Sequence, residues 1–115
     1  MHILFVTGNS ELRAVVERVL GREGYEITTA SHSGHALLAG FECEHVDILI
    51  SELQLDGTTG ETVTASLRRY HPAIRAVYMA DAGTPPRPGV VVRPFTRDDL
   101  VREIEACRVI SPAAS

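Results

Sequence analysis

The stretch ILISELQLDGTTG, from Ile48 to Gly60, joins a mainly apolar run to a turn that contains two glycines. A short apolar run bounded by turn residues is typical of a strand that is buried on both faces of a parallel sheet. This run ends on Glu52, so a carboxylate stands at the exit of a hydrophobic strand. Such an acid is a catalytic group, one half of an ion pair, or a solvated side chain. Which of these applies depends on the residues that the rest of the chain brings near it.

Strand-like and helix-like segments alternate along the chain. Apolar runs predict strands at residues 3–6, 25–30, 47–51, 74–79 and 90–92. Helical spacing predicts helices at residues 12–20, 36–41 and 63–70, and a last helix that opens at the capping-box sequence of residues 96–99. This alternation predicts an α/β fold in which helices cover both faces of a parallel sheet.

Composition and charge narrow the classes of function. The chain has 115 residues, which suits one domain with one core. Its net charge of −4 offers no positive field for nucleic acid. No apolar run approaches the length of a membrane span, so we expect a cytoplasmic protein that binds neither nucleic acid nor membrane. The scattered histidines, and two cysteines that lie far apart at Cys43 and Cys107, predict no metal site.

Several side chains follow directly after the predicted strands. In open parallel sheets, sites form beyond the carboxyl ends of the strands. The residues at these ends are Thr7 and Gly8 after the first strand, Glu52 after the third, Ala80 after the fourth and Arg93 after the fifth. We therefore expect these five positions to lie together at one edge of the sheet.

The order of these segments resembles the receiver domain of two-component response regulators, from Ile3 to about Ala106. Four stretches carry the resemblance, in the family's order and at sensible spacings: ILFVTGNSELR, DILISELQLDGTTG, AIRAVYMADAG and VVVRPFTRDDL. The resemblance implies a flavodoxin-like (CheY-like), doubly wound sheet of five parallel strands. It places a receiver-like domain over residues 1–110, and residues 111–115 are expected to form a disordered tail.

Every position that carries chemistry in a working receiver is substituted here. The family has two acids after the first strand, an aspartate after the third, a hydroxyl residue after the fourth and a lysine after the fifth. The resemblance places the acids on Thr7 and Gly8, the phosphoacceptor on Glu52, the hydroxyl on Ala80 and the lysine on Arg93. The bond before Pro94 corresponds to a Lys-Pro bond that is usually cis in the family. We interpret the chain as a degenerate receiver, or pseudo-receiver.

These substitutions predict the loss of phosphoryl chemistry. Magnesium prefers carboxylate oxygens, and Thr7 and Gly8 provide none, so we expect Mg²⁺ binding to be lost or very weak and no other cofactor to be bound. Glu52 also has one methylene more than an aspartate, and a misplacement of about 1 Å costs roughly 100-fold in rate. We expect Glu52 and Arg93 to form an ion pair that imitates the contact between a phosphorylated aspartate and the lysine. The alternative is two solvated groups, whose contact is worth about 0–1 kcal/mol.

The fourth helix of the family is predicted to be shortened or missing. Residues 80–89, ADAGTPPRPG, contain three prolines and two glycines, which favour an extended, polyproline-like strap. Loss of this helix would expose apolar side chains of the fourth and fifth strands, and such patches often mark interfaces. We expect a partner or a second copy of the chain to pack there. The alternative is that the prolines themselves cover the gap.

The sequence thus predicts a non-enzymatic signalling module that acts by phosphorylation-independent protein contact within two-component or phosphorelay signal transduction. Its partner would be a sensor kinase, a regulator or a fused output domain, and a homodimer would use the surface left by the missing helix. Two alternatives stay open. The first is an atypical phosphoacceptor at Glu52 or Ser51. The second is a small-anion binder in which Thr7, Gly8 and Asn9 present backbone N–H groups at a helix N-terminus.

Overall fold

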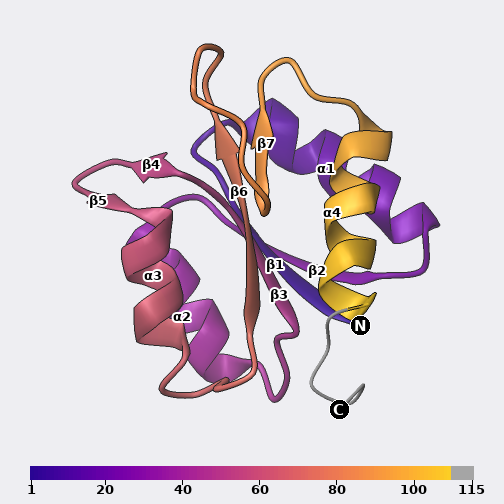
Figure 1. Cartoon of the computed structure of the whole chain (residues 1–115). Helices are drawn as coiled ribbons and strands as arrows, with labels where there is room; N and C mark the ends of the chain where they lie inside the picture. The colour runs from indigo at the N-terminus through magenta and orange to yellow at the C-terminus, as the bar shows by residue number, and fades with distance from the viewer. Residues whose placement is uncertain (110–115) are drawn as a thin grey trace.

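The fold is built on one sheet of five parallel strands, seen in a computed structural model that describes residues 1–109 (Figure 1). The strands are β1 (His2–Val6), β2 (Glu26–Ala30), β3 (Ile48–Glu52), β6 (Arg75–Ala80) and β7 (Val90–Val92). Their order in the sheet is β2-β1-β3-β6-β7, and every pairing is parallel. This is the flavodoxin-like order, so the predicted fold class is confirmed. The predicted tail, residues 111–115, lies outside the described residues.

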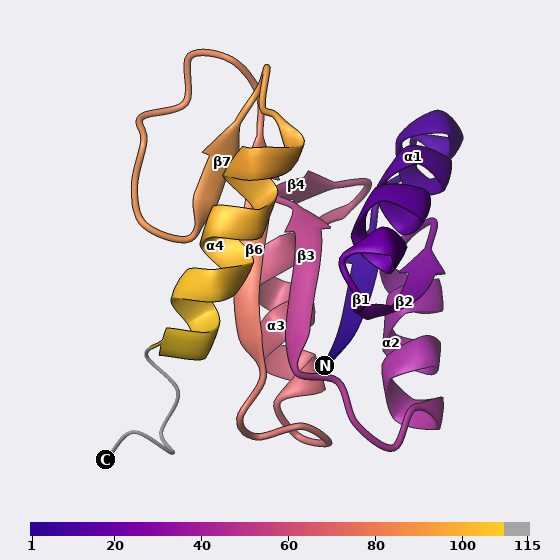
Figure 2. The same ribbon diagram turned by 90° about the vertical axis from the view of Figure 1, so that its right-hand side faces the viewer.

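Four helices cover the two faces of the sheet. They are α1 (Ser10–Arg22), α2 (Ser33–Glu42), α3 (Gly60–Leu67) and α4 (Arg97–Val109). The pair α1 and α4 lies on one face and the pair α2 and α3 on the other (Figures 1 and 2). Within the described residues 1–109, none of these helices has the length and apolar character needed to cross a membrane.

Two apolar cores follow from the alternation of side chains along the strands. In β1, Ile3 and Phe5 belong to the core that includes residues of α1 and α4, while Leu4 and Val6 belong to the core that includes residues of α2 and α3. All four side chains are fully buried. A strand covered on both faces must be apolar at successive positions, which is why the central strands read as continuous hydrophobic runs.

The helix α2 begins earlier than its hydrophobic pattern predicts because two histidines organise its start. The Nδ1 of His32 accepts a hydrogen bond from the backbone N–H of His35 at 3.1 Å and caps the helix. The ring of His35 in turn accepts from the N–H of Ser31 at 3.3 Å. The two closely spaced histidines therefore have a structural role.

A small hairpin in the loop between β3 and α3 was not predicted. It pairs β4 (Gln54–Leu55) with β5 (Thr58–Thr59), antiparallel. Gly57 lies in its turn with a φ of 78°, a conformation that glycine adopts without the steric cost of a Cβ atom. Thr59 then caps α3 by accepting from the N–H of Thr62 at 3.1 Å.

No helix forms between β6 and β7 in the described chain, as predicted, and residues 81–89 form a strap instead. The expected apolar patch beside these strands, however, is wrong, because Val90 and Val91 are only 8% and 6% exposed. The strap prolines flank these strands. Pro86 lines a hollow with Val90 and Val91, and Pro88 lines another with Tyr78. The alternative, in which the prolines themselves cover the gap, stays a prediction.

The helix α4 opens with the reciprocal capping box that its sequence predicts. The backbone N–H of Thr96 donates to Oδ2 of Asp99 at 2.8 Å, and the N–H of Asp99 donates to Oγ1 of Thr96 at 3.2 Å. The hydrogen bond from the Thr96 backbone, with smaller contributions from Arg102, holds the pKa of Asp99 below its usual value.

We expect Asp99→Asn to lower the melting temperature at neutral pH and to reduce the acid sensitivity of the fold. A carboxyl whose pKa is lower in the folded state stabilises the fold above its unfolded pKa, and this stabilisation is lost as the pH falls through the folded pKa. The difference between wild type and variant should therefore narrow between pH 7 and about pH 3, measured by thermal unfolding. A difference that stays constant over this range would contradict the prediction.

Candidate functional site

Three of the five predicted site residues meet at the carboxyl edge of the sheet. Thr7 follows β1, Glu52 ends β3 and Arg93 follows β7. Oε2 of Glu52 accepts a hydrogen bond from Oγ1 of Thr7 at 2.7 Å and another from Nη2 of Arg93 at 2.6 Å. The predicted Glu52–Arg93 ion pair is therefore present, and the contact with Thr7 adds a third strand end to it.

The ion pair is only partly accessible to solvent. The side chains of Arg93 and Glu52 are 31% and 18% exposed, whereas Thr7 is fully buried. Nη1 of Arg93 is buried without a hydrogen-bond partner in the described chain, and it lies 3.6 Å from Oδ1 of Asp81. The guanidinium also lies over the ring of Phe95, with Cζ 5.8 Å from its centroid. The Arg93–Pro94 peptide bond is cis, as the resemblance implies.

The other two predicted positions bring no functional side chain to this contact. Ala80 is buried, and its carbonyl accepts from the backbone N–H of Arg93 at 2.9 Å. Gly8 is exposed, and a Cβ built on it would come no closer than 3.8 Å to the carbonyl of Ser31. Both positions lie at the expected edge, but their chemistry is limited to the backbone.

Arg13 is a site residue that the sequence did not reveal. Its Nη1 donates to the carbonyl of Thr7 at 2.6 Å. The N–H of Asn9 donates to Oγ1 of Thr7 at 3.2 Å, so Thr7 is held from two further directions. Helical side chains lean toward the helix N-terminus, and Arg13 stands one turn into α1. This position in the helix explains why its guanidinium lies beside Thr7, and it is the feature of the sequence from which the contact could have been predicted.

A second polar cluster supports the opposite side of the Glu52 strand end. The fully buried Ser51 donates its hydroxyl hydrogen to the carbonyl of Glu52 at 2.9 Å. Tyr78 and Thr64 join their hydroxyl groups at 2.7 Å, and Thr64 also donates to the carbonyl of Gly60 at 2.9 Å. The contact between Thr64 and Tyr78 ties β6 to α3, while the Ser51 hydrogen bond lies within β3.

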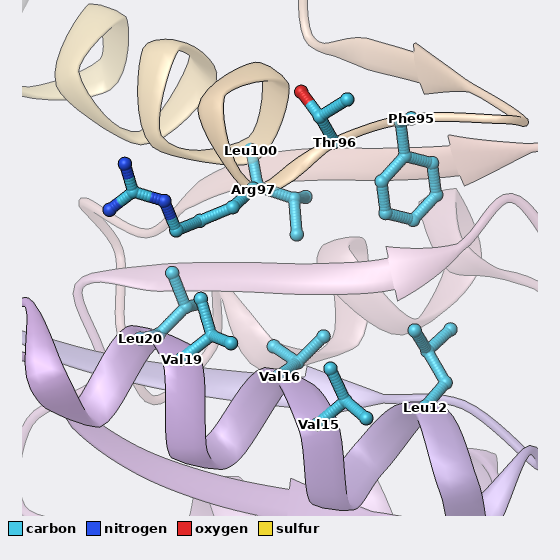
Figure 3. A pocket seen from close by; sticks show the side chains of 9 residues that line it. All are labelled: Leu12, Val15, Val16, Val19, Leu20, Phe95, Thr96, Arg97 and Leu100. Atoms are coloured by element: carbon cyan, nitrogen blue, oxygen red, sulfur yellow. The ribbon is translucent and has the colours of Figure 1, made fainter.

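An apolar groove of about 130 Å³ runs between α1 and the start of α4 (Figure 3). None of the five predicted site residues lines it, and Phe95, which lines the groove, also contacts Arg93 of the ion pair. The lining residues are Leu12, Val15, Val16, Val19, Leu20, Phe95, Thr96, Arg97 and Leu100. The groove is therefore a neighbour of the candidate site and no part of it.

Comparison with known proteins identifies the family of this fold. The sequence model described as "Response regulator receiver domain" matches residues 3–105. The chain belongs to the response regulator receiver domain family. Receiver domains are signalling modules of two-component systems, in which they contact kinases and output domains. No curated protein sequence matches this receiver domain significantly.

Solved structures support the fold of this receiver domain. A response regulator receiver protein from Sinorhizobium medicae superimposes with a TM-score of 0.84 at 18% identity, covering 96% of each chain. The receiver domain of the hybrid histidine kinase CckA gives a TM-score of 0.79 at 24% identity, covering 93% of this chain and 98% of the other. The N-terminal domain of a three-domain response regulator/sensory box/GGDEF protein from Carboxydothermus hydrogenoformans gives 0.83 at 18% identity, with full coverage of both chains.

The residues at this edge do not fit the magnesium ion that the resemblance implies for a working receiver. Mg²⁺ binds oxygen ligands, usually one or two carboxylates together with water molecules. Thr7 donates its hydroxyl hydrogen to Glu52, and Arg93 binds the same carboxylate oxygen. Among the described residues 1–109, no group of three or more His, Cys, Asp or Glu side chains is placed to hold a metal ion.

Removing one partner of the Glu52–Arg93 ion pair should lower the free energy of unfolding more than removing one partner of an exposed surface pair. We expect Arg93→Met to lower the free energy of unfolding by about 1–3 kcal/mol, between the values for exposed and buried pairs, because Glu52 loses its counter-charge. Urea unfolding of Arg93→Met, Glu52→Gln and the double variant would give the coupling energy. The matched control is Arg97→Met, whose pair with Glu23 has a length of 2.9 Å but side-chain exposures of 52% and 33%. Equal losses in Arg93→Met and Arg97→Met would contradict the prediction.

A residue larger than glycine at position 60 should destabilise the fold. A Cβ at this position would lie 2.6 Å from the carbonyl oxygen of Glu52 and 3.0 Å from Oγ of Ser51. We expect Gly60→Ala to lower the free energy of unfolding by about 1–3 kcal/mol, because the backbone of the site must move. At Gly21 in α1 a Cβ would meet nothing within 4 Å, so Gly21→Ala should stabilise the protein by up to about 1 kcal/mol. Urea unfolding measures both, and a stable Gly60→Ala would refute the close packing.

Proposed function

We propose that this receiver domain is a degenerate receiver, which signals by phosphorylation-independent protein contact. The observation that carries the proposal is the occupation of one carboxylate oxygen of Glu52 by both Arg93 and Thr7. The pair joins the strand ends that a phosphorylated aspartate and its lysine would join in a working receiver. In this proposal Glu52 imitates the phosphorylated side chain, and the domain is held in a single state.

The proposal includes the loss of strong magnesium binding. A metal ion at Glu52 would have to displace the guanidinium of Arg93, whose second nitrogen already lacks a hydrogen-bond partner in the described chain. Displacement would leave a partly buried cation next to a divalent one, which is electrostatically unfavourable. Phosphoryl transfer in this family of reactions depends on such positioned charge, and here the charge at the site is internally neutralised.

The contacts at the edge weigh against both alternative functions. Ser51 is fully buried and its hydroxyl is engaged by the carbonyl of Glu52, so a phosphodonor has no access to it. An anion site at the start of α1 would need free N–H groups. Two of the three N–H groups in that hypothesis are already engaged, because the N–H of Thr7 donates to the carbonyl of Ala30 at 3.1 Å and the N–H of Asn9 donates to the Thr7 hydroxyl.

The proposed partner is a sensor kinase, a regulator or a fused output domain. The receiver domain of CckA belongs to a hybrid histidine kinase, and the Carboxydothermus hydrogenoformans receiver is the N-terminal domain of a three-domain protein. A homodimer stays a prediction. Its motivation was the expected exposure of valines in β7, and Val90 and Val91 are buried.

Incubation with acetyl phosphate and Mg²⁺ tests the proposed function. We expect intact-protein mass spectrometry to show no added phosphoryl group, because the nucleophile is misplaced and paired and no acid pair holds the metal. A phosphoryl group attached at Glu52 or Ser51 would refute the proposal.

The positive control restores the working chemistry on the same scaffold. Thr7→Asp, Gly8→Asp, Glu52→Asp, Ala80→Thr and Arg93→Lys combined should give a chain that gains a phosphoryl group and binds Mg²⁺, as measured by titration of amide chemical shifts. Because Thr7 and Ala80 are buried, circular dichroism of the variant first establishes that it folds. If this variant folds and reacts while the wild type does not, the residues at these five positions are the reason that the wild type is not phosphorylated.

A further inference from the structure

We propose that the strap segment Pro85–Pro88 is a docking site for a protein module with an aromatic-lined groove that binds polyproline II helices. The segment reads Pro-Pro-Arg-Pro and so places prolines at the first and fourth positions, the spacing by which such grooves bind their ligands. The function proposed above is protein contact, and this inference assigns a surface to it. The inference rests on the proposed function only for the biological purpose of the binding. It uses neither Glu52 nor Arg93.

The sequence alone fixes the backbone of this segment to a narrow range. Each proline locks its own φ near −65°, and the residue before a proline is restricted to the extended or polyproline II region. Thr84, Pro85 and Arg87 each precede a proline. Successive residues from Thr84 to Pro88 are therefore restricted at φ, at ψ or at both, in favour of the polyproline II conformation.

Two turns hold the ends of the segment. At its start, the N–H of Thr84 donates to the carbonyl of Asp81 at 3.2 Å, and Gly83 has a φ of 95°. At its end, the N–H of Val90 donates to the carbonyl of Arg87 at 3.2 Å, with Pro88 at the second position and Gly89 at a φ of 81°. A positive φ at the third position is the requirement of a type II turn, whose second position is itself polyproline II-like.

The end of the strap is also bonded to the body of the domain. The N–H of Gly89 donates to Oε1 of Glu103 in α4 at 3.0 Å, and its carbonyl accepts from the N–H of Tyr78 at 2.8 Å. A segment fixed in this way loses little conformational entropy when a partner binds it. This rigidity distinguishes the strap from a proline-containing loop that must become ordered on binding.

The segment is presented to solvent. Pro85, Pro86, Arg87 and Pro88 are all exposed, and the strap arches outward from the sheet beside β7 and α4 (Figure 2). A partner can therefore approach it without moving any other element of the described chain. Pro86 and Pro88 also border hollows at the edge of the sheet.

Arg87 gives the segment a charge that a groove can recognise. Its guanidinium lies 3.8 Å from the carboxylate of Glu61, with both side chains more than half exposed, so the pair is readily exchanged for another. The expected partner carries an acidic side chain at the rim of its aromatic groove, since Arg pairs well with carboxylates.

The test is a titration of the isotope-labelled full chain with a panel of purified SH3 and WW domains. At least one module should cause saturable chemical-shift changes at Thr84, Arg87 and Gly89. Pro85→Ala combined with Pro88→Ala should weaken this binding about tenfold or more, while Pro72→Ala, at an exposed proline outside the strap, should leave it unchanged.

Arg87→Glu provides a second variant that keeps all prolines. It should weaken the same binding, and the control Arg18→Glu, on the exposed part of α1, should not. The proposal is overturned if no module of the panel causes saturable shifts, or if binding survives the strap variants. Binding through the strap by a chain that acetyl phosphate does modify would overturn the proposed function and leave this inference standing.

Discussion

One carboxylate oxygen connects the ends of three strands in this receiver domain. Oε2 of Glu52 binds the hydroxyl of Thr7 after β1 and the guanidinium of Arg93 after β7, while Glu52 itself ends β3. In a working receiver the corresponding groups would carry like charges at the first and third strands, and a metal would be needed to hold them together. Here the neutral hydroxyl of Thr7 and the cationic guanidinium of Arg93 bind the carboxylate directly, so the charge at this edge is balanced without a ligand.

In the proposed function, this charge balance explains how the scaffold persists without phosphoryl chemistry. The apolar runs of β1 and β3 are fully buried and are fixed by packing, independently of what stands at their ends. The residues at the carboxyl ends of the strands are under a different constraint, because a buried or half-buried charge must be paired. Thr7 satisfies it by donating to Glu52, and Arg13 adds a second guanidinium that holds the Thr7 carbonyl.

The sequence predicts those features that follow from local patterns or from the geometry of parallel strands. The Glu52–Arg93 pair is one of them, because parallel strands bring their carboxyl ends to one edge. The hydrogen bond from Thr7 was missed because a threonine in place of an acid was interpreted only as a lost ligand. The hairpin of β4 and β5 consists of two-residue strands, too short to give a period-two pattern. The burial of Val91 was mispredicted because this side chain belongs to the core that includes Leu100 and Ile104 of α4, a packing that the sequence of the strap does not specify.

The proposed loss of the switch chemistry and the absence of a helix between β6 and β7 in the described residues are consistent with each other. A ligand or modification shifts a protein only between states that it binds differently, and a second state must exist to be populated. The helix between β6 and β7 is replaced by residues that prolines and two turns hold in one conformation. In the proposed function, a domain that is held in one state has little to gain from phosphorylation. In the function proposed for it, information would be carried by which partner is present, and the rigid strap and the occupied Glu52 would serve recognition.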